Sequence, residues 1–122
     1  MEKTIYYHDT DAGGVVYYAN YLKFLEEART EYLVERGISP HGDFFYAVIE
    51  CHVKYKSPAR YGDRIRVTAE ITKITAAQIH FRQDIFHAQD GRLLVTADVR
   101  LVYLSRDFKP EALSDDVRGR LQ

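Results

Sequence analysis

The stretch Tyr7–Gly37, YHDTDAGGVVYYANYLKFLEEARTEYLVERG, decides the fold, because it joins a glycine-rich loop to one long amphipathic segment. From residue 18 to residue 36, apolar residues recur at the three- and four-residue spacing of a helix. The apolar positions are Tyr21, Leu25, Ala28 and Tyr32, with Leu22, Phe24 and Leu33 on the flanks; Lys23, Glu26, Glu27, Arg29 and Glu31 supply much of the opposite face. Gly37 stands where a helix C-cap is expected. The pattern predicts one long helix over residues 18–36.

The rest of the chain predicts antiparallel strands joined by short turns. A short first strand is expected at residues 4–8, and alternation of apolar and polar residues predicts strands at 49–56, 65–72 and 78–87. The longest predicted strand is 93–104, which is apolar on both faces and is therefore expected to be covered on both sides. Short connections such as Gln89–Gly91 require antiparallel neighbours. We predict a single α+β domain over residues 1–122, with one long helix on a sheet of about five strands.

One helix cannot cover both faces of such a sheet. We therefore expect the other face, or a long edge strand, to be hidden in an oligomer.

The formal net charge of −1 argues against a nucleic-acid-binding module, which usually carries a basic face. The start of the chain does not resemble a signal peptide, and no run approaches the roughly 18 apolar residues of a spanning helix. We expect a cytoplasmic protein without an integral membrane segment. The single cysteine, Cys51, fits a reducing compartment and is predicted to be a small core residue.

The chemistry-bearing residues lie on the loop before the helix. Asp9 and Asp11 flank a threonine there, and Gly13 and Gly14 let the backbone approach a substrate closely. Attack on a carbonyl needs a base or nucleophile and hydrogen-bond donors for the developing oxyanion, and the free N–H groups at a helix start are such donors. From these residues alone, a plain turn with exposed carboxylates is an equally good reading.

The run Tyr7–Tyr17, the following Asn20-Tyr21 and the helix sequence FLEEARTEYL from Phe24 resemble the 4-hydroxybenzoyl-CoA thioesterase-like family. Within that family, the chain looks most similar to the acyl-CoA thioesterases associated with the Tol–Pal system. The similarity is specific over the first 37 residues and looser through Val53–Asp63. The resemblance implies a hotdog fold, in which a helix is wrapped in a curved antiparallel sheet. It also implies an acyl-CoA substrate, no cofactor, and homodimers that often pair into tetramers with sites at subunit interfaces.

By this resemblance the catalytic carboxylate falls on Asp11, acting as general base or as nucleophile. The oxyanion donor in the family is a backbone N–H at the helix start, which corresponds here to Tyr18 or its neighbour. Many Tol–Pal-type members have His at the position of Tyr18. Because this chain has Tyr there, a His-assisted mechanism is not expected. Tyr7 corresponds to a site-lining tyrosine that could hydrogen-bond the carboxylate or the substrate. The loop residues expected to contact substrate are Gly13, Gly14 and Val15.

We expect the other polar and aromatic residues to have structural rather than catalytic roles. Asp9 is expected to be a loop or capping residue, and His8 to point away from Asp11. His52, His80 and His87 occupy separate strands without ligand spacing, so no metal site is predicted. Tyr17, Tyr21 and Tyr32 are assigned to the core or an interface.

A basic cluster surrounds the turn after residue 56, and it consists of Lys54, Lys56, Arg60, Arg64 and Arg66. A solvated strand face is the plainer reading. The functional reading is contact with CoA phosphates, for which Arg60 is the best single candidate.

Two other functions fit the same fold. Hydratases and dehydratases of acyl thioesters generally pair a His with an acidic residue, but the segment 18–36 contains no His. A non-catalytic protein that binds acyl thioesters or serves as an interaction partner is the alternative that we carry forward. The sequence leaves open the acyl chain length, CoA versus acyl carrier protein, and dimer versus tetramer.

Overall fold

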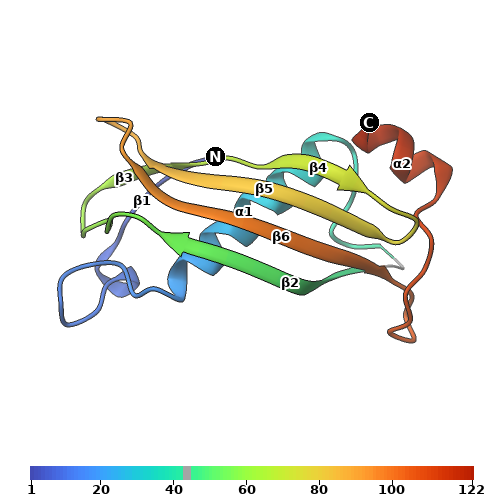
Figure 1. The fold of residues 1–122 in the computed structure, drawn as a ribbon, viewed down its shortest axis with the longest axis horizontal. Coiled ribbons are helices and arrows are strands. Elements are labelled where there is room, and N and C mark those ends of the chain that lie inside the picture. Colours follow the sequence, from blue (N-terminus) through green and yellow to red (C-terminus); the bar gives the residue numbers. More distant parts are fainter. Residues whose placement is uncertain (43–44) are drawn as a thin grey trace.

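The computed structural model describes residues 1–42 and 45–122, which form one helix-on-sheet unit (Figure 1). The strands are β1 (Glu2–Thr4), β2 (Phe45–Tyr55), β3 (Arg64–Val67), β4 (Glu70–Ile74), β5 (Gln78–His87) and β6 (Leu93–Leu104). The helices are the 3-10 turn η1 (Tyr7–Asp9), α1 (Asn20–Glu35) and α2 (Asp115–Leu121). Figure 1 shows α1 lying across one face of the sheet and α2 at the end opposite the loop that precedes α1.

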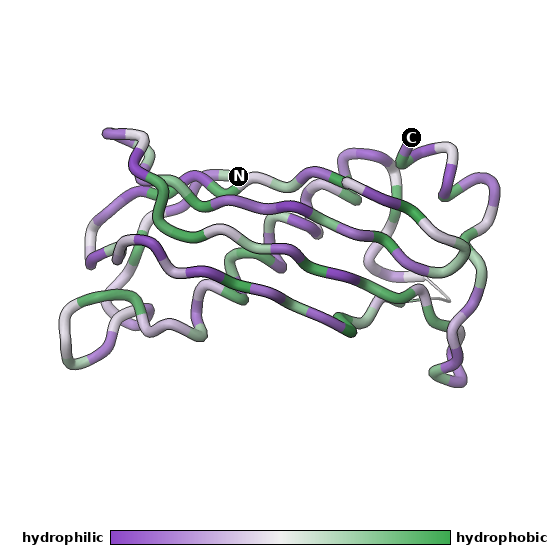
Figure 2. Tube along the Cα trace, viewed as in Figure 1, coloured by the Kyte–Doolittle hydropathy of each residue, from purple (hydrophilic) through white to green (hydrophobic). Residues whose placement is uncertain are grey.

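The sheet is antiparallel, with the order β1-β3-β5-β6-β2, and β4 also pairs with β5. The predicted α+β class is confirmed, although the sheet has six strands rather than about five. Figure 2 shows hydrophilic and hydrophobic residues alternating along the long strands. β6 lies between β5 and β2, and most of its residues on both faces are buried, as its sequence predicts.

The predicted long helix is confirmed, and its apolar side packs on the sheet. Tyr21, Phe24, Leu25 and Ala28 are buried in one core with residues of β3, β5 and β6. The helix ends before Gly37, whose φ of 78° is the left-handed conformation expected of a C-cap glycine. Within the described residues, neither α-helix has the length and hydropathy needed to span a bilayer.

Three local predictions are wrong. The strand expected at residues 4–8 ends at Thr4, and the chain then turns into η1. The strand expected at 65–72 is interrupted at Thr68, so it forms two strands, β3 and β4. The N–H and the hydroxyl of Thr68 both donate to the Asp84 carbonyl, and the Thr68 hydroxyl accepts from the Asp84 N–H. The helix α2 was not predicted, although Ser114 caps it by accepting from the Val117 N–H.

Two burial predictions are also wrong. Arg29, placed on the polar face of the helix, is only 7% exposed. Cys51, predicted to be a core residue, is exposed on β2, which is the last strand in the described order of the sheet. Alternation shows which side of a strand is apolar, but it does not show whether another layer covers that side.

Candidate active site

The loop between η1 and α1 is held by Asp9, which is only 2% exposed. Its carboxylate accepts from the Tyr6 N–H at 2.9 Å, and its backbone carbonyl accepts from the Tyr17 N–H at 3.0 Å and the Asn20 side chain at 2.9 Å. These bonds tie both ends of the loop to one residue. The expectation that Asp9 is a loop or capping residue is therefore confirmed.

Asp11 lies on the exposed side of this loop, in a turn made by Gly13 and Gly14. One carboxylate oxygen accepts from the Gly13 N–H at 2.8 Å, and the Asp11 carbonyl accepts from the Gly14 N–H at 3.0 Å. Gly14 has a φ of 78°, and a Cβ on Gly13 would lie 3.1 Å from the Asp11 Oδ1 atom. The Asp11 N–H in turn donates to the Val15 carbonyl at 3.0 Å. The two glycines therefore make the turn possible. Among the described residues, the Asp11 carboxylate accepts a hydrogen bond through its Oδ1 atom alone.

The chain enters α1 through Tyr17 and Tyr18, and this entry leaves backbone donors free. The Asn20 N–H bonds the Tyr17 carbonyl at 2.8 Å, but in the described part of the chain the N–H of Tyr18 has no acceptor. The Tyr18 carbonyl accepts from the Tyr55 hydroxyl at 3.1 Å, which fixes the peptide against β2. Free N–H groups and the helix dipole make this point favourable for negative charge.

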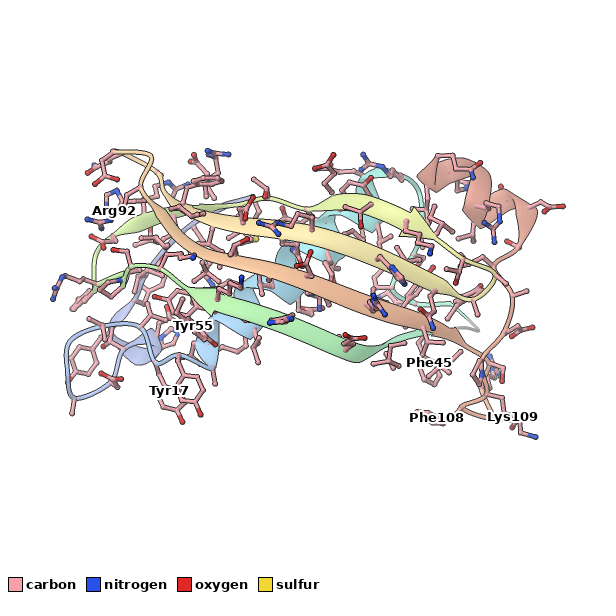
Figure 3. The ribbon with its side chains drawn as sticks, viewed as in Figure 1. Tyr17, Phe45, Tyr55, Arg92, Phe108 and Lys109 are labelled. Carbon is pink, nitrogen blue, oxygen red and sulfur yellow. The ribbon has the colours of Figure 1, made fainter. Side chains whose placement is uncertain are left out.

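Tyr17 lies beside the loop that carries Asp11. It was assigned to the core or an interface; its side chain is 45% exposed, so it is not a core residue, and its ring is tilted against that of Tyr18 at 4.9 Å. The charge of Tyr18 and the hydrogen bond between the two hydroxyls are the main causes that raise the pKa of Tyr17, and the charge of Asp11 adds to them. The Tyr17 hydroxyl is therefore within electrostatic reach of the Asp11 carboxylate. Figure 3 shows Tyr17 and Tyr55 at the same end of the molecule.

The turn that carries Arg60 lies against the loop that carries Asp11. Val15 forms an isolated antiparallel bridge with Arg60, and the Val16 N–H donates to the Ala59 carbonyl at 2.9 Å. The Arg60 N–H donates to the Asp63 carboxylate at 2.8 Å, whereas the Arg60 guanidinium is exposed and has no ion pair among the described residues.

Two of the other four basic residues have partners, and two have none among the described residues. Arg64 pairs with Glu2 at 3.4 Å, and the Arg66 guanidinium lies 4.6 Å from the centre of the Phe86 ring. Lys54 and Lys56 are exposed, and no acidic partner is found for them in residues 1–42 and 45–122. The structure thus leaves three of the five predicted basic residues unpaired.

Tyr7 does not contact Asp11 in this structure. Its ring is 75% exposed and packs edge-on against the ring of Tyr61 at 5.8 Å. His8 stacks on Tyr6, and its Nε2 atom lies 3.5 Å from Asp9 rather than beside Asp11. The structure therefore groups Asp11, the two glycines, Val15, Tyr18 and Arg60, with Tyr7 on the outer side of the group.

A hollow of about 730 Å³ lies beside the loop, between α1 and β2. Its lining has an apolar part, formed by Leu22, Leu25, Val48 and Val99. The other lining residues are Cys51 and the polar or charged residues Lys3, His8, Asp9, Lys23, Glu26, Glu27 and Arg29. Burial raises the pKa of the Cys51 thiol, with the charge of Arg29 acting in the opposite direction. A thiol with a raised pKa is a poor nucleophile, so Cys51 is a wall of the hollow and not a second catalytic group.

Comparisons with known proteins identify the family and the fold of the chain. Residues 6–121 match the model of a family described as the thioesterase-like superfamily. The chain belongs to this superfamily. It is 37% identical over 118 residues to an acyl-CoA thioester hydrolase, YbgC, of Escherichia coli O6:H1, an alignment that covers 93% of this chain and 87% of the relative. It is 34% identical over 120 residues to an acyl-CoA thioesterase, YbgC, of Haemophilus influenzae, covering 94% and 88% of the two chains.

A solved structure described as a 1,4-dihydroxy-2-naphthoyl-CoA thioesterase from Synechocystis superposes with a TM-score of 0.90 at 27% identity, covering 99% of this chain and 93% of that one. The predicted family and the predicted hotdog fold are therefore confirmed, and with them the prediction of a thioester hydrolase. Among the described residues, no group of three His, Cys, Asp or Glu side chains is placed to hold a metal ion.

Proposed function

We propose that this thioester hydrolase acts on acyl-CoA thioesters of small or medium acyl groups, with Asp11 as its catalytic carboxylate. The observation that carries the proposal is the pairing, on one loop, of a fixed exposed carboxylate with the free N–H of Tyr18 at the start of α1. The carboxylate can deprotonate water or attack the thioester carbonyl directly. The Tyr18 N–H, aided by the helix dipole, stabilises the oxyanion that forms in either route.

The remaining loop residues are assigned to substrate binding. Gly13, Gly14 and Val15 present backbone to the thioester, since the glycines carry no side chain that would keep it away. The hollow between α1 and β2 offers an apolar space next to the loop for the acyl group. Arg60, bridged to Val15 and without an ion pair, is assigned to the CoA phosphates.

We further propose that the protein works as a homodimer, or as a tetramer of two dimers, with its sites at subunit interfaces. β2 has 11 residues, lies at an edge of the sheet, and exposes Val48 and Ile49 to about half of their area. A long apolar edge of this kind needs a partner strand. Asp11 is exposed in the single chain, and a second copy on this edge would enclose it. The cytoplasmic location expected from the sequence stays a prediction.

The proposal is tested with the wild-type protein and its Asp11→Asn variant on a panel of acyl-CoAs, following the release of free thiol. We expect turnover by the wild type and a loss of about a hundredfold or more in the variant, the scale of removing a base or nucleophile. Asp107→Asn is the matched control and should keep full activity, because Asp107 is exposed and is the neighbour in sequence of Phe108, which lies at the opposite end of the molecule from Tyr17 (Figure 3).

A second variant tests the oxyanion donor. Tyr18→Phe keeps the backbone N–H and should keep most of the activity, because the side-chain hydroxyl is not assigned a role in the reaction. If the wild type releases no thiol while the protein is folded, the alternative of a non-catalytic acyl-thioester-binding or interaction protein replaces the catalytic assignment.

A further inference from the structure

The outer side of the catalytic loop carries two aromatic side chains that face water. Tyr7 is 75% exposed and Tyr61 is 62% exposed, and their rings meet edge to face with centroids 5.8 Å apart and an interplanar angle of 76°. Neither hydroxyl has a hydrogen-bond partner in the part of the chain that the structure describes. Because the two rings are nearly perpendicular, a flat ligand can stack on the open face of one ring while the other ring contacts its edge.

The backbone beneath this pair is fixed on both sides. The Gly62 N–H donates to the Ile5 carbonyl at 2.9 Å, and the Ile5 N–H donates to the Asp63 carbonyl at 2.8 Å. Gly62 has a φ of 88°, which allows the tight turn after Tyr61. The segment before η1 and the turn at residues 60–63 are thus bonded to each other, so the two rings are placed before any ligand arrives.

Unpaired positive charge lies on the same turn. The side chains of Lys56 and Arg60 are exposed and have no ion pair among the described residues, whereas Arg64 is occupied by Glu2 and Thr4. The chain as a whole carries a net charge of −1, so this positive charge is local to the turn. Exposed rings beside free cations match a ligand that combines a planar base with phosphate groups.

We propose that the ring of Tyr61 stacks on the adenine of CoA with Tyr7 against the edge of the base, and that Arg60 and Lys56 bind the phosphates. The inference rests on the proposed acyl-CoA substrate. The bridge between Val15 and Arg60 connects the two parts of the site. The thioester lies at Asp11 on one side of this bridge, and the nucleotide lies at Tyr61 on the other.

The test compares two thioesters of the same acyl group, one with CoA and one with N-acetylcysteamine, which lacks the nucleotide. Tyr61→Ala should lower kcat/KM for the CoA thioester about fivefold to tenfold, the effect of losing one stacked base, and leave the N-acetylcysteamine thioester unchanged. Tyr61→Phe keeps the ring and should behave as wild type. Phe108→Ala is the matched control, because Phe108 is 72% exposed at the opposite end of the molecule (Figure 3).

Binding of adenosine 3′,5′-bisphosphate, measured by calorimetry, gives a readout that does not depend on hydrolysis. Tyr61→Ala and Arg60→Ala should each weaken this binding, while Phe108→Ala and Lys109→Ala should not. If the bisphosphate binds but neither thioester is hydrolysed, the nucleotide site stands and the catalytic proposal falls. If both thioesters are hydrolysed with equal efficiency and the bisphosphate does not bind, the nucleotide site is refuted while the thioesterase proposal stands.

Discussion

A buried polar pair joins α1 to β5 and allows a stability prediction to be worked out in full. Gln83 is fully buried, and its Nε2 atom donates to the Leu25 carbonyl at 3.0 Å and to the Thr68 carbonyl at 3.2 Å. Its Oε1 atom accepts from the Arg29 Nη1 atom at 3.0 Å. Because both carbonyls require the amide nitrogen, the amide oxygen must face Arg29. Burial lowers the pKa of Arg29, as expected for a charge that is poorly solvated.

Gln83→Leu keeps the size of the side chain and removes all three bonds. The two bonds to carbonyls contribute about 1 kcal/mol each, and the bond from the charged guanidinium about 2 kcal/mol. The extra apolar area of leucine returns about 1 kcal/mol. The expected loss in the free energy of unfolding is therefore about 3 kcal/mol. A chain of 122 residues has an unfolding entropy of about 0.26 kcal/mol/K, so the loss corresponds to a fall of about 12 °C in Tm.

The assay is thermal and urea unfolding at one fixed protein concentration, since association would otherwise change Tm. Gln78→Leu, at a less buried position of the same strand, is the control and should cost under about 1 kcal/mol. In a double-mutant cycle, the combination with Arg29→Met should cost about 1–2 kcal/mol less than the sum of the single variants, because neither polar group is then left alone. A loss below about 1 kcal/mol in Gln83→Leu, or strict additivity in the cycle, would refute the reasoning.

Two further predictions concern pH and assembly. Burial raises the pKa of Tyr46 to about 12 from 10.0, so the unfolded chain loses this proton first and the folded state loses stability as pH rises from 10.0 to about 12. Tyr46→Phe removes this titration and should flatten the decline in the free energy of unfolding over that range; parallel curves for the two proteins would contradict it. Val48→Lys places a charge on the free edge of β2 and should convert the wild-type assembly to monomers in analytical ultracentrifugation. Phe108→Lys is its control, and an unchanged assembly in Val48→Lys would exclude the β2 edge as the interface.

The elements with a strong internal period were predictable from the sequence. The helix and the strands β5 and β6 have long runs in which the apolar spacing admits one reading, and their observed bounds fall within two residues of the predicted ones. Ser114 followed by Asp115 and Asp116, with Arg118 and Arg120 in the last turn, was an available signal for α2. It was missed because the segment has only seven residues and few apolar positions.

The errors arose where a contact distant in sequence decides the outcome. Arg29 has the charge expected of a solvated helix position, but Gln83 lies 54 residues away and provides a buried acceptor for it. The break between β3 and β4 likewise depends on Asp84, which bonds Thr68 across the sheet. No pattern within one segment contains these partners, so the local spacing of apolar residues could not reveal them.

The candidate site likewise has one part formed by neighbouring residues and another formed by residues distant in sequence. This difference bears on how the substrate is selected. Asp9, Asp11, the two glycines and Tyr18 lie in one continuous segment, and the hydrogen bonds of the two carboxylates are made within it, although the loop also bonds the turn at Ala59 and Arg60. The shape of the turn around Asp11 is therefore largely encoded locally, but Asp11 was singled out by the resemblance to the thioesterase family and not by its local pattern. The hollow beside the loop is formed by α1 with β2 and β6, and the basic turn follows β2. If the proposed roles hold, substitutions on these later elements should alter the acyl group or the carrier that is bound while Asp11 and the Tyr18 N–H stay in place.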